Sequence, residues 1–226
     1  MRQLIMESCG LTIMVIKTNF NSKNNNSEIM RNFIVFSLFV GILGFIVSAC
    51  KEDSEAALVK MEQRELAKGI RFDSLFLGLS LGMSNKDFYA RCWEMNKQGT
   101  VLAGSGNESV SLKRADMKYP VTMNFYPKFQ NNKISEMPIQ FQYDSWAPWV
   151  RQAQPDSLQM DVLDLMEKWY GKGFIKMKNK DYGLSFVKVD GNRRIFIHQQ
   201  PEMFVRVIIS DLTVAKGLEK PVVKKG

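Results

Sequence analysis

Histidine and cysteine are scarce in this chain, which has one histidine and three cysteines among its 226 residues. A zinc site needs several Cys, His or carboxylate ligands at characteristic spacings, and a calcium loop needs clustered oxygen ligands. Neither pattern occurs. His198 lies in a strand-like run in which alternation places Arg194, Phe196 and His198 on one face and Ile195 and Ile197 on the other. No nucleophile can be identified beside it. The sequence therefore predicts no metal, no cofactor and no catalytic residue.

Glycine motifs that bind phosphate or position a nucleophile are also missing. Gly78 and Gly82 are isolated, so they form neither a dinucleotide-binding nor a phosphate-binding loop. Gly104-Ser105-Gly106 does not fit the G-x-S-x-G elbow of serine hydrolases. These absences indicate a protein that is not an enzyme.

The three cysteines cannot build a disulfide framework. Cys9 precedes the signal described below, Cys50 ends it, and Cys92 is then left without a partner. Because Cys92 falls in a helical pattern beside Phe88 and Met95, we expect a buried thiol that acts as a small hydrophobic residue.

One long apolar run stands out. Residues 30–50, MRNFIVFSLFVGILGFIVSAC, have one cation, Arg31, then an apolar centre and small residues before Cys50, which is the order of a secretory signal. Val47-Ser48-Ala49-Cys50 resembles the lipobox of bacterial lipoproteins. The resemblance implies that Cys50 receives a diacylglycerol and, after cleavage of the signal, becomes the first residue.

A single transmembrane anchor is the alternative for the same stretch. A helix needs about 20 apolar residues to cross a bilayer, whereas residues 33–49 supply 17 before a charged segment.

Signals of roughly 15–30 residues are usual, whereas a signal that began at Met1 would be 49 residues long. We therefore interpret residues 1–29 as a mis-called or extended N-terminus, with translation starting at Met30.

The segment after the cysteine, Lys51-Glu52-Asp53-Ser54-Glu55, is charged. It fits a hydrated tether between a lipid and a folded domain. It also resembles the acidic export signal of surface lipoproteins of the Bacteroidetes type. That resemblance implies a lipid-anchored protein of the outer membrane that is exposed at the cell surface.

The rest of the chain is predicted to be one domain with short appendages. We assign residues 30–49 to the signal peptide, 50–69 to a tether and a spacer helix lying loosely on the domain, 70–215 to the domain, and 216–226 to a basic tail. Residues 1–49 carry four basic and two acidic side chains, which leaves 27 and 21 in the remaining 177 residues, a net charge of +6. These charges are dispersed and predict a solvated surface. No nucleic-acid partner is expected for a protein outside the inner membrane.

Apolar periodicity predicts an α+β fold of two halves, each a helix followed by antiparallel strands, because most connections are too short for parallel crossovers. The sequence does not decide whether the two halves are copies of one duplicated unit. Helices are expected over residues 54–68 and 84–97, the latter capped by Ser84 and Asp87, and between Pro155 and Gly171. Asn131-Asn132 and Asp190-Gly191-Asn192 are expected turns. The expected strands are residues 100–103, 109–113, 121–126, 134–143, 174–178, 184–189, 193–198 and 203–209.

The lipobox, the Gly78–Ser84 stretch GLSLGMS before a helix, and the order of strands resemble two groups of proteins. These are the small α+β lipoproteins of the outer-membrane assembly machinery and the related repeat-built inhibitor domains. The resemblance implies a binding or scaffolding role and assigns no functional residue.

Aromatic residues supply the remaining candidates. Trp146, Trp149 and Arg151 lie together in WAPWVR and are the candidate ligand-binding residues, since Trp and Arg favour binding hot spots. The alternative is that both rings fill the junction between the halves. Trp93 and Trp169 lie on predicted helices and are expected in the core.

The sequence thus predicts a lipid-anchored envelope module that binds or scaffolds another envelope protein or a glycan. The alternative is an envelope hydrolase with an unrecognised site. It requires His198 to lie near a carboxylate and a hydroxyl.

Overall fold

The computed structural model describes residues 54–104, 109–114, 116–145, 154–179, 181–200 and 203–214. Within these ranges the fold has three helices, α2 (Ser54–Leu66), α3 (Asn85–Lys97) and α4 (Pro155–Tyr170). The strands are β1 (Leu102–Ala103), β2 (Val110–Arg114), β3 (Val121–Phe125), β4 (Lys128–Gln130), β5 (Lys133–Tyr143), β6 (Ile175–Asn179), β7 (Gly183–Asp190), β8 (Arg193–Gln200) and β9 (Phe204–Asp211).

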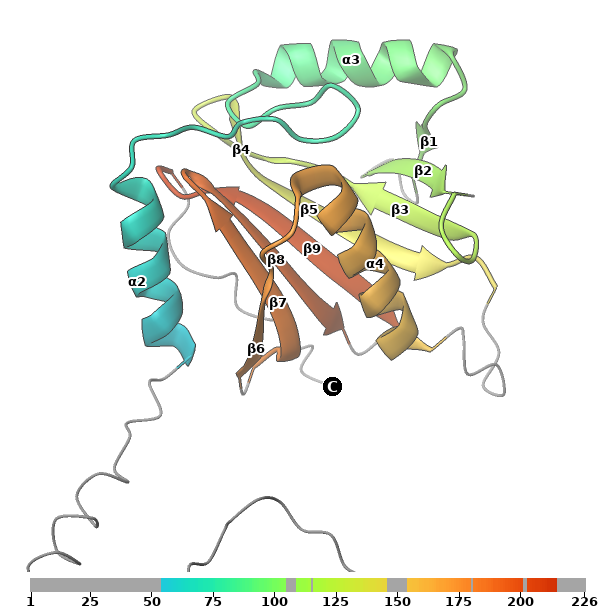
Figure 1. The fold of residues 1–226 in the computed structure, drawn as a ribbon. Coiled ribbons are helices and arrows are strands. Elements are labelled where there is room, and N and C mark those ends of the chain that lie inside the picture. Colours follow the sequence, from blue (N-terminus) through green and yellow to red (C-terminus); the bar gives the residue numbers. More distant parts are fainter. Residues whose placement is uncertain are drawn as a thin grey trace, which may run out of the picture. The chain divides into compact units, whose positions relative to one another are not determined.

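All nine strands join one antiparallel sheet in the order β1-β2-β3-β5-β9-β8-β7-β6, and the short β4 pairs with β5 (Figure 1). The α+β class is confirmed, with strands predominating. Every expected helix and strand is present within a few residues. Strand β4 was not predicted, because it is only three residues long.

Turn chemistry explains the hairpin that β4 and β5 form. Asn131 and Asn132 both have positive φ angles, 51° and 60°. A two-residue turn with this geometry matches the twist of paired strands, and asparagine tolerates it better than most residues. The turn itself was expected, but β4 rather than β3 precedes it.

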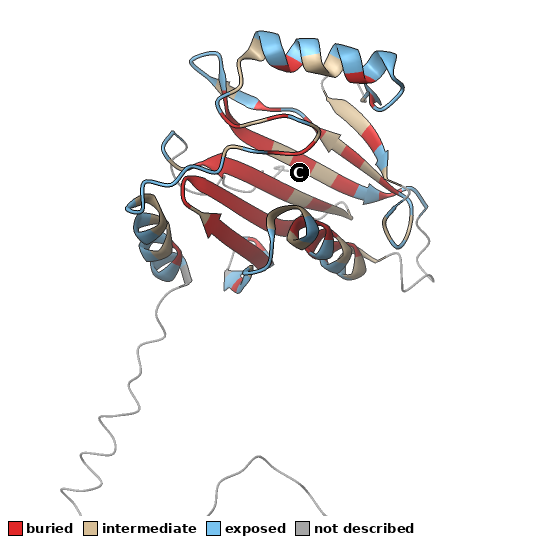
Figure 2. Ribbon diagram, turned by 45° about the horizontal axis from the view of Figure 1, so that its top comes forward, coloured by how far each residue is buried: buried red, intermediate tan, exposed pale blue. Residues whose placement is uncertain are grey.

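The main core lies between α4 and one face of the sheet. Ile195 and Ile197 of β8 point to this face and pack with Val207 of β9 and Val162 of α4. Arg194, Phe196 and His198 alternate to the opposite face, as strand periodicity predicted. Figure 2 shows that buried residues dominate the central strands.

Helix α2 packs on that opposite face. Leu58, only 5% exposed, joins a second buried cluster with Val187 and Val189 of β7 and Phe196 of β8. The sequence predicted a spacer helix lying loosely on the domain; α2 does lie on the domain, with Leu58 buried and Met61 half-buried against the sheet.

Helix α3 lies over a strap, residues 70–83, that runs from α2. Ser84 caps the helix, its Oγ accepting from the Asp87 backbone N–H at 3.1 Å, which confirms the expected role of Ser84. The Asp87 carboxylate accepts from the Ser84 hydroxyl at 2.7 Å rather than from its backbone N–H. Phe88 and Met95 face the main core. The start of β5 holds the end of the strap, since the Ile134 N–H donates to Met83 O at 2.9 Å.

A polar cluster fixes the beginning of the strap to the β7–β8 hairpin. Arg71 binds Asp73 and Asp211, each at 2.8 Å, and Asn192 Nδ2 donates to Asp73 at 2.9 Å. Burial raises the pKa of Asp211, but hydrogen bonds from Thr213, Arg71 and Asn192 outweigh it and hold that pKa below its ordinary value. The cluster therefore keeps the Asp211 carboxylate charged at neutral pH.

At Gly191, the tip of this hairpin, we expect one added methyl group to have a large effect on stability. A Cβ there would lie 2.1 Å from the carbonyl oxygen of Ile70, and φ is +53°. We expect Gly191→Ala to cost about 1–3 kcal/mol of unfolding free energy beyond backbone strain. Urea unfolding followed by tryptophan fluorescence measures it.

Gly183→Ala is the matched control, because Gly183 also has a positive φ, +61°, but open space around the added Cβ. It isolates the strain of the left-handed backbone, about 1 kcal/mol. Equal losses in the two variants would contradict the close approach of the strap to the hairpin.

Candidate functional site

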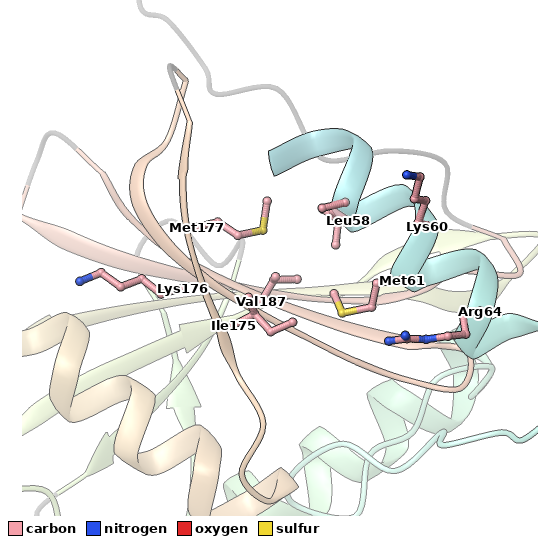
Figure 3. A pocket seen from close by; sticks show the side chains of 9 residues that line it. Leu58, Lys60, Met61, Arg64, Ile175, Lys176, Met177 and Val187 are labelled. Atoms are coloured by element: carbon pink, nitrogen blue, oxygen red, sulfur yellow. The ribbon is translucent and has the colours of Figure 1, made fainter. Parts of the chain in front are cut away.

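A groove of about 430 Å³ separates α2 from the edge of the sheet (Figure 3). Helix α2 forms one wall, and strands β6 and β7 form the other. We call it the α2–β6 groove. Its lining residues are Ala57, Leu58, Lys60, Met61, Arg64, Ile175, Lys176, Met177 and Val187.

The inner surface of the groove is apolar. Leu58 and Met61 of α2 point toward Met177 and Val187 of the sheet (Figure 3). Ile175 lies beside them and is 49% exposed, which is unusual for isoleucine on a strand. Methionine side chains are flexible and polarizable, so this lining can adapt to varied apolar groups.

The charged residues that line the groove are all positively charged. Lys60 and Arg64 are four residues apart on α2, hence on neighbouring turns of one face, and Lys176 lies on β6. None of the nine described lining residues is acidic. In Figure 3 the Lys176 side chain points away from α2. An apolar groove bordered by cations favours a ligand that combines apolar and acidic groups.

An ion pair beside the groove holds α2 in place. Arg194 of β8 is buried, with 1% of its side chain exposed, and its Nη1 donates to Glu62 Oε1 of α2 at 2.8 Å. A buried guanidinium needs a compensating charge, because desolvation of an ion is costly. Glu62 supplies such a charge only when α2 lies on the sheet, so the ion pair and the groove form together.

His198 lies on the same sheet face and is 3% exposed. Its ring packs against Tyr182 and Phe196, with centroid distances of 4.8 and 5.2 Å. Nδ1 lies 3.0 Å from the carbonyl oxygen of Gln199. These are contacts of a packed core residue. They provide no support for the role of a solvent-accessible base.

Cys92 is half-buried on α3. Burial raises the pKa of its thiol to about 11, against a smaller opposing effect of Arg91. The thiol is therefore protonated at neutral pH and is a poor nucleophile.

The four residues named as sites from the sequence, Cys50, Trp146, Trp149 and Arg151, lie outside the described residues. Of the other tryptophans, Trp169 packs on the core as expected, stacked on Phe76 at 5.6 Å. The expectation for Trp93 was wrong. It is 64% exposed, because α3 turns only its Phe88–Met95 side to the core.

Two further properties of the described ranges bear on the site. They contain no cluster of three His, Cys, Asp or Glu side chains that could hold a metal ion. No helix among them is long and apolar enough to span a bilayer.

The ion pair of α2 gives a second prediction. We expect Glu62→Gln to lower the free energy of unfolding by about 2 kcal/mol, below the range for fully buried pairs because Glu62 keeps some solvent contact. Chemical denaturation measures the loss. As a control, Glu94→Gln changes an exposed pair with Arg91 and should cost under about 1 kcal/mol. A loss at Glu62 no larger than at Glu94 would show that α2 does not depend on this ion pair.

The Cys92 thiol gives a third prediction. The pKa of Cys92 is raised from 9.0 to about 11, so at pH 7.5 its thiolate fraction should be lower than that of an unperturbed cysteine by a factor on the order of 100. We expect iodoacetamide to alkylate Cys92 correspondingly slowly in the folded chain, and faster as the pH rises. Peptide mass spectrometry gives the rate, with the urea-unfolded chain as reference. Equal rates in the folded and unfolded chains would refute the perturbed thiol.

Comparison with known proteins gave no relative. No protein-family model matches the chain, and neither a curated protein nor a solved structure is significantly similar to it. The function therefore has to be argued from the residues themselves.

Proposed function

We propose that this chain is a lipid-anchored envelope protein whose folded part is a non-enzymatic binding or scaffolding module. The lipobox-like Val47-Ser48-Ala49-Cys50 supports the anchor. The α2–β6 groove supports binding and is the observation that carries the proposal. Helix α2, one wall of this groove, begins only four residues after Cys50 in the sequence.

The groove favours another envelope protein over a glycan as the partner. A glycan needs many hydrogen-bonding groups, whereas most of the groove lining is apolar. Trp146, Trp149 and Arg151 remain the candidates for a glycan or a second contact.

The alternative of an envelope hydrolase receives less support. His198 is buried between aromatic rings, and burial keeps the Cys92 thiol protonated. Neither residue has the exposure or activation that nucleophilic catalysis requires. We therefore propose structural roles for both residues.

The proposal includes location at the outer membrane. Lys51-Glu52-Asp53 resembles the acidic address of surface lipoproteins, which favours the outer leaflet. The net positive charge of the mature chain favours contact with anionic envelope surfaces. We propose no nucleic-acid partner.

The proposal also includes an origin by duplication. Helix α3 precedes β1, β2, β3 and β5, and α4 precedes β6, β7, β8 and β9. The last strands of the two halves, β5 and β9, pair antiparallel at the centre of the sheet. This order is what a two-fold repeat of one helix-and-strands unit would give, with β4 as an addition to the first copy.

The anchor is tested by metabolic labelling with an alkyne analogue of palmitate. We expect Cys50→Ala to reduce label to background, because the thiol that receives the diacylglycerol is gone, and mass spectrometry should find no mature N-terminus at residue 50. Cys92→Ala is the control and should label like the unmodified chain. Label retained in Cys50→Ala, or an unlabelled full-length chain in membranes, would reject the lipoprotein in favour of another attachment.

A further inference from the structure

Strand β6 is the last strand in the order of the sheet. It pairs with β7 along one side over five residues, Ile175 to Asn179. Its other side has no strand partner among the described residues. The backbone N–H and C=O groups of such an edge can pair with an added strand.

The two faces of β6 differ in chemistry. Ile175 and Met177 face α2 and line the groove, as Figure 3 shows. Lys176 and Lys178 alternate to the other face and are exposed. Over residues 175–178 the edge therefore alternates apolar and cationic side chains.

We infer that β6 binds an extended segment of a partner protein in which apolar and acidic residues alternate. The segment adds to the sheet as a further strand. Its apolar residues enter the α2–β6 groove beside Ile175 and Met177, and its carboxylates lie across from Lys176 and Lys178. This inference rests on the proposed binding function and names the class of partner.

Charge complementarity selects this occupant over a second copy of the chain. Two antiparallel β6 strands centred on Met177 would place Lys176 of one copy opposite Lys178 of the other. Like charges directly opposite each other destabilise a strand pair, whereas opposite charges stabilise it. The cations Lys60 and Arg64 on α2 add to the preference for an acidic partner.

If the two lysines served only to prevent pairing between copies of the chain, fewer features of this edge would be explained. Lysine on an edge strand prevents pairing between copies, and that accounts for Lys176 and Lys178. It does not account for the exposed Ile175 and the apolar groove behind it. Both features are expected when a strand with apolar residues on one face covers them.

Binding is measured by fluorescence anisotropy with the protein purified from membranes in detergent. The probe is a fluorescein-labelled seven-residue peptide of alternating valine and glutamate. We expect it to bind at least tenfold more tightly than a valine–lysine peptide and than a peptide with its valines and glutamates in separate blocks. Added salt should weaken binding, since the pairs are exposed. No binding, or equal binding of the valine–lysine peptide, overturns the inference.

Charge reversal in the protein provides the matched test. The double variant Lys176→Glu with Lys178→Glu should bind the valine–glutamate peptide at least tenfold more weakly. It should bind the valine–lysine peptide more tightly than the valine–glutamate peptide. The control, Lys86→Glu with Lys133→Glu, makes the same change of charge at exposed lysines outside the groove lining. Equal weakening in both double variants would attribute binding to net charge and overturn the site.

N-methylated peptides separate strand addition from simple filling of the groove. Alternate residues of an edge-pairing strand point their N–H groups toward β6. Methylation of one alternate set should therefore abolish binding, and methylation of the other set should preserve it. If methylation of either set changed binding equally, the peptide would not be adding to the sheet as a strand. Palmitate labelling at Cys50 is independent of all these results, so the lipid anchor can stand when this inference fails.

Discussion

Arg194 places a permanent positive charge on the sheet face where Val187, Val189 and Phe196 belong to a buried apolar cluster. An apolar surrounding favours such a charge only when an anion accompanies it. Glu62 brings that anion from a helix 132 residues earlier in the chain. Docking of α2 then buries Leu58, closes part of the sheet face and leaves the groove between α2 and β6. Glu62, which pairs with the buried charge, and Leu58 and Met61, which line the groove, thus lie on the same helix.

The strap that follows α2 reinforces this arrangement. Arg71 and Asp73 attach it to Asn192 and Asp211 around the β7–β8 hairpin. Gly191 allows the carbonyl of Ile70 to approach the hairpin tip. Lys188, on the other sheet face, donates to the carbonyl of Tyr170 at 2.6 Å and neutralises the negative end of α4. Both helical layers are therefore attached to β7 and β8 by polar contacts as well as by apolar packing.

Local signals predicted most of the elements, because each depends on neighbouring residues. The alternation of Arg194 to His198, the Ser84 cap and the Asn131-Asn132 turn were all correct. The docking of α2 could not be predicted in this way. Its apolar stripe is thin, and the contacts that hold it come from residues more than a hundred positions away. The α2–β6 groove was missed for the same reason, since its walls are distant in sequence. Exposure of Trp93 likewise depends on which side of α3 meets the sheet.

Helix α2 is a layer of the fold and therefore a stable wall of the groove. Hydrogen–deuterium exchange of the protein purified from membranes, followed by mass spectrometry, measures how firmly α2 stays on the sheet. We expect amides over residues 58–66 to exchange as slowly as those of β8, because α2 opens only with the sheet. Exchange of α2 many times faster than that of β8, near the rate of an isolated helix, would show that the helix does not stay on the sheet.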